Sequence, residues 1–158
     1  MGYTHYYQVL NWDSDEWKAA WPQLIKDVPM IIDRANGIEI SGPTEDEEIV
    51  TPVQIDAEKG IYINGVGDDS HEPFIIKKDG WSFCKTARKP YDDIVTTILL
   101  RAYMLPPKGF DVSSDGYWDE WSEAQDIYKK LWPGEAPRCP WADKLEQEES
   151  DDPAIRVE

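Results

Sequence analysis

Residues 74–115 constrain the fold of this chain more than any other stretch, because they combine a predicted β-hairpin with a predicted helix and a further strand. Two short runs of strand-forming residues, 74–78 and 81–85, lie on either side of Asp79 and Gly80. An Asp-Gly pair tolerates the positive φ angles of the type I′ turn that joins two antiparallel strands. We therefore expect a hairpin here.

A helix is expected soon after the hairpin. Pro90 suits a first helical turn, because its missing N–H would have no partner there. Apolar residues then recur at three- and four-residue steps between residues 91 and 105, and Pro106 ends the pattern. Residues 110–113 follow as a strand. The order strand, helix, strand predicts a βαβ unit, with two parallel strands and a right-handed crossover.

This predicted topology also places a candidate ligand site. The carboxyl ends of parallel strands meet at one edge of a sheet, where ligands of such folds commonly bind. The ligand-binding residues predicted at that edge are Lys85, Thr86, Arg88, Lys89 and Ser114. The residues predicted to orient the ligand or to transfer protons there are His71, Glu72 and Asp115.

The cations of this stretch contrast with the rest of the chain, which carries a formal net charge of −16. Lys85, Arg88 and Lys89 precede a helix N-terminus, where free N–H groups and the helix dipole favour an anion. We therefore predict binding of a small phosphate- or carboxylate-bearing ligand, such as a nucleotide, with acid/base catalysis as a further option. The alternative is that these cations only neutralise neighbouring acids such as Asp92 and Asp93.

Other reactive side chains carry weaker signals. Asp68, Asp69, His71 and Glu72 are of the types that bind a divalent metal, but they match no metal-site spacing, so no metal site is predicted. Cys84 is interpreted as a small buried residue, and a catalytic nucleophile is the alternative. No motif identifies a cofactor.

The remainder of the chain completes an α+β domain. A strand is expected at residues 3–10, and helices begin near Asp13 and Tyr117. We predict one domain over residues 1–134, with a mixed, mostly antiparallel sheet of about four to six strands that contains the βαβ unit, and with about three helices packed on it. Residues 135–158 are rich in acids and are predicted to form a largely extended tail.

Composition bears on partners and on the cellular compartment. The 158 residues include 32 acids against 16 bases, so nucleic acid is not an expected partner, because its phosphates would be repelled. No apolar run reaches the length of a membrane span, and residues 1–5 lack the basic and apolar regions of a secretory signal. We expect a soluble, cytoplasmic protein with reduced thiols, whose oligomeric state is left open.

The charge also supports a hypothesis of a different class. The chain would be an acidic interaction or inhibitor protein that binds a basic partner, for example by presenting carboxylates as a nucleic acid presents its phosphates. This hypothesis expects binding that weakens steeply with salt and that persists when the cluster of Lys85, Arg88 and Lys89 is neutralised.

Residues 83–92, FCKTARKPYD, and residues 112–116, VSSDG, resemble the signature of an uncharacterised family of small phage, bacterial and fungal proteins. Segments similar to residues 3–6 and 71–74 accompany that signature in the family. The resemblance leaves out the acidic end of the chain and the loop near Glu45. It implies no activity, but it falls on the same segments that the predicted topology gathers at one edge.

Overall fold

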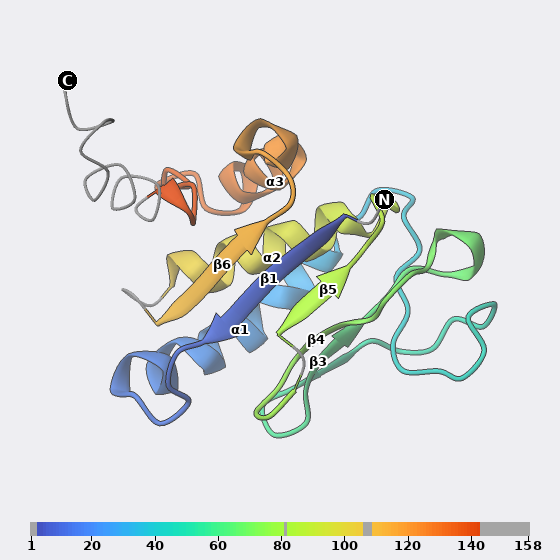
Figure 1. The fold of residues 1–158 in the computed structure, drawn as a ribbon, viewed down its shortest axis with the longest axis horizontal. Coiled ribbons are helices and arrows are strands. Elements are labelled where there is room, and N and C mark those ends of the chain that lie inside the picture. Colours follow the sequence, from blue (N-terminus) through green and yellow to red (C-terminus); the bar gives the residue numbers. More distant parts are fainter. Residues whose placement is uncertain (1–2, 81, 106–108, 143–158) are drawn as a thin grey trace, which may run out of the picture.

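The computed structural model describes residues 3–80, 82–105 and 109–142, which form a single α+β domain (Figure 1). Two short 3₁₀ turns, Gly67–Asp69 and Trp118–Trp121, accompany the main elements. The helices are α1 (Asp15–Ile32), α2 (Asp92–Met104) and α3 (Ser122–Leu131). The strands are β1 (Thr4–Val9), β2 (Gln54–Asp56), β3 (Gly60–Ile63), β4 (Phe74–Ile76), β5 (Phe83–Lys85) and β6 (Phe110–Ser114).

The strands form two antiparallel sheets of three strands each, with the orders β5-β1-β6 and β2-β3-β4. In the first sheet Thr4 pairs with Lys85, and His5 pairs with Cys84 on one side and with Ser114 on the other. Because β5 and β6 are both antiparallel to β1, they run in the same direction. Their carboxyl ends therefore lie at the same edge, on either side of the start of β1 (Figure 1).

The α+β class is confirmed, but the predicted single mixed sheet with a βαβ unit is replaced by the two separate sheets. The N-terminal strand β1 is inserted between β5 and β6, so these two strands do not pair with each other. The alternation of β1 explains why it occupies the central position. His5 and Tyr7 point inward and are buried, whereas Tyr6 and Gln8 point outward and are exposed.

The predicted hairpin also differs from the structure. β4 pairs with β3 and β5 pairs with β1, so the two runs belong to different sheets. The turn between them runs from Lys77 to Gly80, whose N–H donates to the Lys77 carbonyl at 3.0 Å. Asp79 takes the positive φ, at 62°, as a central residue of that turn. The Asp-Gly pair therefore marks a chain reversal here without joining two paired strands.

Helix α2 is the centre of the core, and all of its residues from Ile94 to Ala102 are buried. Helices α1 and α3 pack against it, and both α1 and α2 lie behind the first sheet in Figure 1. Arg101 of α2 is buried and donates through Nε to Asp27 Oδ2 of α1 at 2.8 Å. A charge at this depth is tolerated because it is paired and hydrogen-bonded.

The first residues of the predicted tail pack on the domain. Glu135 accepts a hydrogen bond from Arg101 at 3.1 Å. Trp141 meets Trp121 edge-to-face, with 5.3 Å between the ring centroids. Residues 143–158, the rest of the predicted tail, lie outside the described residues. No helix of the described residues is long and apolar enough to cross a membrane.

Candidate functional site

The loop after β5 contains an unusual turn between Thr86 and Lys89. The Lys89 N–H donates to the Thr86 carbonyl at 3.0 Å, and the two central residues, Ala87 and Arg88, both have positive φ angles, of 52° and 59°. Two positive φ angles in succession are the pattern of a type I′ turn, which normally carries Asn and Gly. Residues with a Cβ are strained in this region by about 1–2 kcal/mol each.

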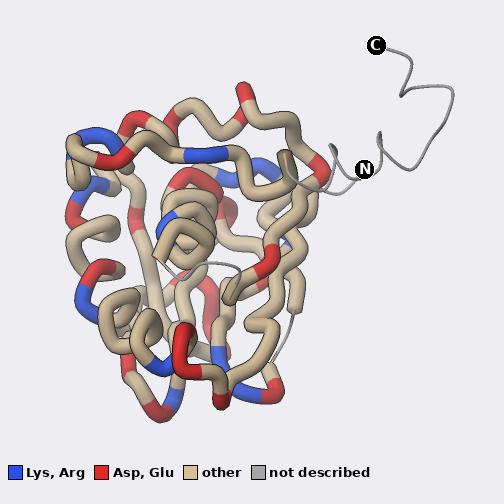
Figure 2. Tube along the Cα trace, turned by 90° about the vertical axis from the view of Figure 1, so that its left-hand side faces the viewer, with Lys and Arg blue, Asp and Glu red and all other residues tan. Residues whose placement is uncertain are grey.

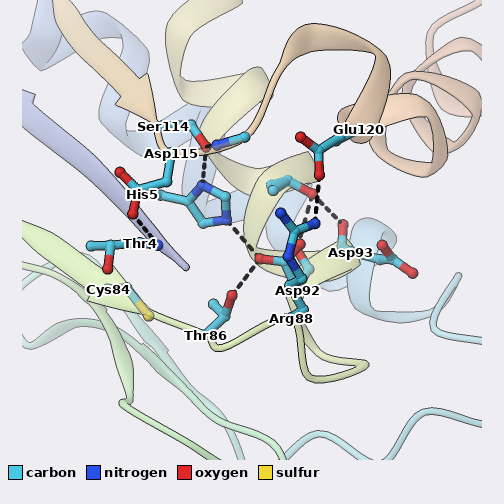
Figure 3. Close-up of polar contacts among 12 residues, drawn as sticks. Thr4, His5, Cys84, Thr86, Arg88, Asp92, Asp93, Ser114, Asp115 and Glu120 are labelled. Atoms are coloured by element: carbon cyan, nitrogen blue, oxygen red, sulfur yellow. Dashed lines mark hydrogen bonds and ion pairs between the residues drawn. The ribbon is translucent and has the colours of Figure 1, made fainter. Parts of the chain in front are cut away.

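This turn directs Thr86 into the protein, where a buried polar network begins (Figure 3). The Thr86 hydroxyl donates to Oδ1 of Asp92. His5, which is fully buried, contacts the same carboxylate oxygen through Nε2 at 2.6 Å. Its other ring nitrogen, Nδ1, lies 2.8 Å from the Ser114 hydroxyl. The network thus links the start of β1 to the end of β6 and to the start of α2.

Ser114 contacts His5, and His5 contacts Asp92, in the same arrangement as the nucleophile, base and orienting acid of a catalytic triad. The Ser114 hydroxyl is already occupied, however. It accepts the Gly116 N–H at 2.9 Å and also hydrogen-bonds the hydroxyl of Tyr3. A hydroxyl with this many internal partners has its lone pairs and proton in use. We therefore interpret the network as one that fixes the ends of three elements.

Arg88 points outward from the strained turn, but its charge is offset locally. Its guanidinium donates to a carboxylate oxygen of Glu120 and lies 3.9 Å from the ring centroid of Tyr3. The hydrogen bond that Arg88 donates to Glu120 raises the pKa of Arg88. Burial, together with the charges of Asp92 and Glu120, raises the pKa of Tyr3 to about 12. Tyr3 is therefore neutral near neutral pH, and Arg88 is fully charged.

His71 and Glu72, shortly before β4, reach the same edge, as the sequence predicted, and their side chains contact the backbone there. Glu72 accepts the Lys85 N–H with its carboxylate at 2.8 Å, while its own N–H donates to the Lys85 carbonyl at 3.2 Å. His71 is exposed, and its Nδ1 lies 2.9 Å from that carbonyl oxygen. Both contacts extend the hydrogen bonding of β5 on the side away from β1.

The structure therefore gathers the predicted residues at one edge, but most of their polar groups are already in use. Asp115 accepts the Thr4 N–H through Oδ2 at 3.1 Å, next to the pairing of Thr4 with Lys85. Thr86, Ser114 and Arg88 bond to protein groups, as described above. Among the described residues, Lys85 and Lys89 form no ion pair.

Sequence reasoning did not assign His5 and Asp92, the centre of the network, to the site. The alternation of β1 places His5 on the buried face, which is the one signal that could have found it. Cys84 lies beside His5 across the strand pair, and burial raises the pKa of its thiol well above the usual value. This is the opposite of what a catalytic thiolate needs.

A second polar region lies on the loop between α1 and β2 and on the turn between β3 and β4. We call it the acidic face; it consists of Glu45, Asp46, Glu47, Glu48, Asp68 and Asp69, all of them exposed. The two segments are joined where the Gly67 N–H donates to the Glu47 carbonyl at 2.6 Å and the Ser70 hydroxyl donates to the Glu47 carboxylate at 3.2 Å.

The acidic face borders a groove and two exposed apolar residues. The groove has a volume of about 500 Å³ and runs between the acidic loop and the side chains of Tyr62, Asn64 and Pro73. Ile49 and Val50 follow the acids directly and are 51% and 52% exposed. No group of three or more His, Cys, Asp or Glu side chains in the described residues is arranged to hold a metal ion.

Two regions are thus candidates for function: the edge with its internal hydrogen-bond network, and the acidic face with its groove. The first has the residues that the sequence singled out. The second has an open groove, and its carboxylates form no ion pair among the residues that the structure describes. Comparison with known protein families, with curated proteins and with solved structures found no match to this chain.

Proposed function

We propose that this protein is an interaction protein that binds a basic partner protein through its acidic face. The observation that supports this most directly is that no cation of the described residues pairs with that face. Within the described residues the four ion pairs are His5–Asp92, Arg88–Glu120, Arg101–Asp27 and Arg101–Glu135. None of them involves a carboxylate of the acidic face.

Such a concentration of like charge has an energetic consequence. Acidic positions occur around the whole trace (Figure 2), in keeping with the net charge of −16. Repulsion between neighbouring carboxylates disfavours the compact state, and a basic partner relieves it on binding. The same field accelerates encounter with a cationic protein and rejects an acidic one. Ile49 and Val50 would add apolar contact beside the charges, as interfaces combine the two.

The anion-binding hypothesis draws less support from the same geometry. An anion at the edge would need free N–H and O–H donors, but Thr86 and Ser114 already bond to protein groups. Glu120 pairs with Arg88, one of the cations that would hold it, and the negative charge of Asp92 also acts on Arg88. Lys85 and Lys89 alone would have to overcome that negative surrounding.

The test is a titration with a fluorescently labelled arginine-rich peptide at low and at physiological salt. The test variant combines Glu45→Gln, Asp46→Asn, Glu47→Gln and Glu48→Gln. The amides keep the acceptor that Asp46 offers to the Glu48 N–H and the one that Glu47 offers to Ser70. We expect affinity to fall about tenfold or more at low salt, and the wild-type affinity to fall steeply as salt is added.

The matched control removes the same charge elsewhere, with Asp33→Asn, Glu39→Gln, Glu58→Gln and Asp119→Asn, all at exposed positions. This variant should keep most of the wild-type affinity. Equal losses in the two variants would show that net charge alone attracts the peptide. Undetectable binding of the peptide to the wild type at low salt, or tight binding of inorganic phosphate that Lys85→Ala abolishes, would overturn the proposal.

A further inference from the structure

A separate cavity lies between the loop that follows α1, the first turn of α2 and the outer side of α3. Its volume is about 330 Å³, at the lower end of the range for small-molecule sites. Five of the side chains that line it are charged: the acids Asp93, Glu123 and Asp126 and the cations Arg34 and Lys130. None of these residues belongs to the acidic face or to the network around His5.

Asp93 is the most unusual of these groups. Its carboxyl is half-buried, and burial, reinforced by the charges of Asp92 and Glu123, raises its pKa to about 6. The backbone carbonyl of Asp93 accepts the Thr97 hydroxyl at 2.6 Å, which holds this residue in the first turn of the helix. A carboxyl that changes charge near neutral pH, placed in a cavity, is typical of functional sites.

The rest of the lining is complementary to a small molecule with an apolar body. Ile38, Ile94 and Ile127 contribute hydrocarbon from three different elements, and Asn36 adds an amide. Asn36 has a positive φ of 35° and precedes Gly37, at 82°, so a tight turn places this wall of the cavity. Apolar walls with a few charged groups are the usual composition of ligand pockets.

We propose that this cavity binds a small zwitterion of the amino-acid class, with its ammonium group paired to Asp93 and Glu123 and its acidic group drawn to Arg34 and Lys130. A purely cationic ligand would be repelled by the two cations of the lining, and a purely anionic one by its three acids. A ligand that carries both charges satisfies both sets, so the mixed lining favours it.

Proton release is the signature of this binding mode. Among the titratable groups near Asp93, Asp92 of its own helix and Glu123 of α3 act on its carboxyl through their charges, and Asp126, Lys130 and Arg34 line the same cavity. When an ammonium group pairs with Asp93 in its protonated form, the carboxylic acid becomes a carboxylate and its proton passes to the buffer. At a pH well above 6 the carboxylate is already present, so no proton is released.

Isothermal titration calorimetry in two buffers of different ionisation enthalpy measures this proton directly. The probes are 6-aminohexanoate and its one-ended analogues, hexylamine and hexanoate. We expect 6-aminohexanoate to bind more tightly than either analogue, and to release a proton near pH 6 but not near pH 8. Asp93→Asn should weaken binding and abolish the proton release, whereas Asp119→Asn, at an exposed position outside the cavity, should change neither.

Three results would overturn this inference: no binding of 6-aminohexanoate, equal affinity for hexylamine, or proton release that survives in Asp93→Asn. Circular dichroism and the unfolding midpoint of each variant show whether it is folded. The inference is independent of the proposed function, because Asp93→Asn should leave binding of the arginine-rich peptide unchanged. If the wild type fails to bind the peptide but binds 6-aminohexanoate, and Asp93→Asn weakens the latter, only the proposal for the acidic face is contradicted.

Discussion

The edge network and the acidic face treat charge in opposite ways. At the edge, the ionisable groups His5 and Asp92 contact each other, and the exposed guanidinium of Arg88 is matched by Glu120. On the acidic face, exposed carboxylates stand side by side with no cation paired to them in the described residues. The polar groups of the edge network hold three elements together, whereas the carboxylates of the acidic face remain available to a partner.

This difference shows that a cluster of polar residues at a sheet edge is not by itself a binding site. The predicted ligands of the edge include donors, Thr86 and Ser114, that the fold already uses. A buried donor or acceptor without a partner is costly, so such groups are satisfied within the protein wherever the fold allows. Unsatisfied groups at the surface cost little, because water pairs with them until a partner arrives.

The largest expected effect follows from removing the buried ring of the edge network. His5→Ala should lower the free energy of unfolding by about 3 kcal/mol, because it leaves a cavity and removes the hydrogen-bond partner of both Ser114 and Asp92. Urea denaturation followed by tryptophan fluorescence measures this loss. The effect would sharpen the comparison by showing that the network is structural.

His71 supplies the matched control, because it is the other histidine of the chain and is exposed. His71→Ala should change the free energy of unfolding by less than about 0.5 kcal/mol. Equal stabilities for the wild type and His5→Ala would break the comparison, since the network would then contribute nothing to the fold.

Part of the fold was predictable from local patterns. Strand alternation and helical periodicity found the central helix and the strands on either side of it, because both patterns depend only on nearby residues. The placement of β1 was not predictable in this way. Its pairing of His5 with Cys84 and with Ser114 joins segments that are about 80 and 110 residues away along the chain. No local pattern records such a contact.

The candidate site was likewise predictable only in part. Chain direction alone placed Lys85 and Asp115 at one edge, and both lie there beside Thr4. The partners of each group were not predictable, because they depend on which side chains fill the space between elements. Asp92 is an example: its place just after Lys85, Arg88 and Lys89 in the sequence suggests that it neutralises these cations, whereas its carboxylate contacts a histidine from β1. The partners of such side chains can be identified only from the three-dimensional structure.

The next largest effect concerns Asp93, whose charge is neither matched, as at the edge, nor fully exposed, as on the acidic face. Aspartate has an ordinary pKa of 3.8, and that of Asp93 is raised to about 6, so between these values the folded protein binds more protons than the unfolded chain. The stability contribution of this group therefore falls as pH rises through that window. Asp93→Asn should add about 1 kcal/mol near neutral pH, after allowance for solvent screening, and nothing below about pH 4.

Urea denaturation of wild type and Asp93→Asn across this pH range measures the effect, and Asp33→Asn, at an exposed position, is the control. The control, at an exposed site, should change the free energy of unfolding by less than about 0.5 kcal/mol. If Asp93→Asn raised the free energy of unfolding equally below about pH 4, the negative charge of Asp93 would not be the cause of the stabilisation.

A smaller effect is expected at the strained turn of the edge. Ala87→Gly should raise the free energy of unfolding by about 0.5–1 kcal/mol, because glycine adopts the positive φ of this position without the clash of a Cβ. Ala19→Gly, at an exposed position inside α1, should instead lower it by about 1 kcal/mol. Thermal denaturation tests whether the two variants change the free energy of unfolding in opposite directions. A lower stability in both variants would show that the turn carries no strain.

The smallest effect on stability is expected where the largest effect on binding is proposed. Neutralising residues 45–48 with the amide variant described above should raise the free energy of unfolding by about 0.5 kcal/mol at low salt, since it removes repulsion between exposed carboxylates. Added salt should reduce this gain, because screening already weakens the repulsion in the wild type. Urea denaturation at low and high salt measures both values. A destabilisation at low salt would mean that these carboxylates make favourable contacts within the fold. The acidic face would then resemble the edge, because its carboxylates would stabilise the fold and would not be available to a partner.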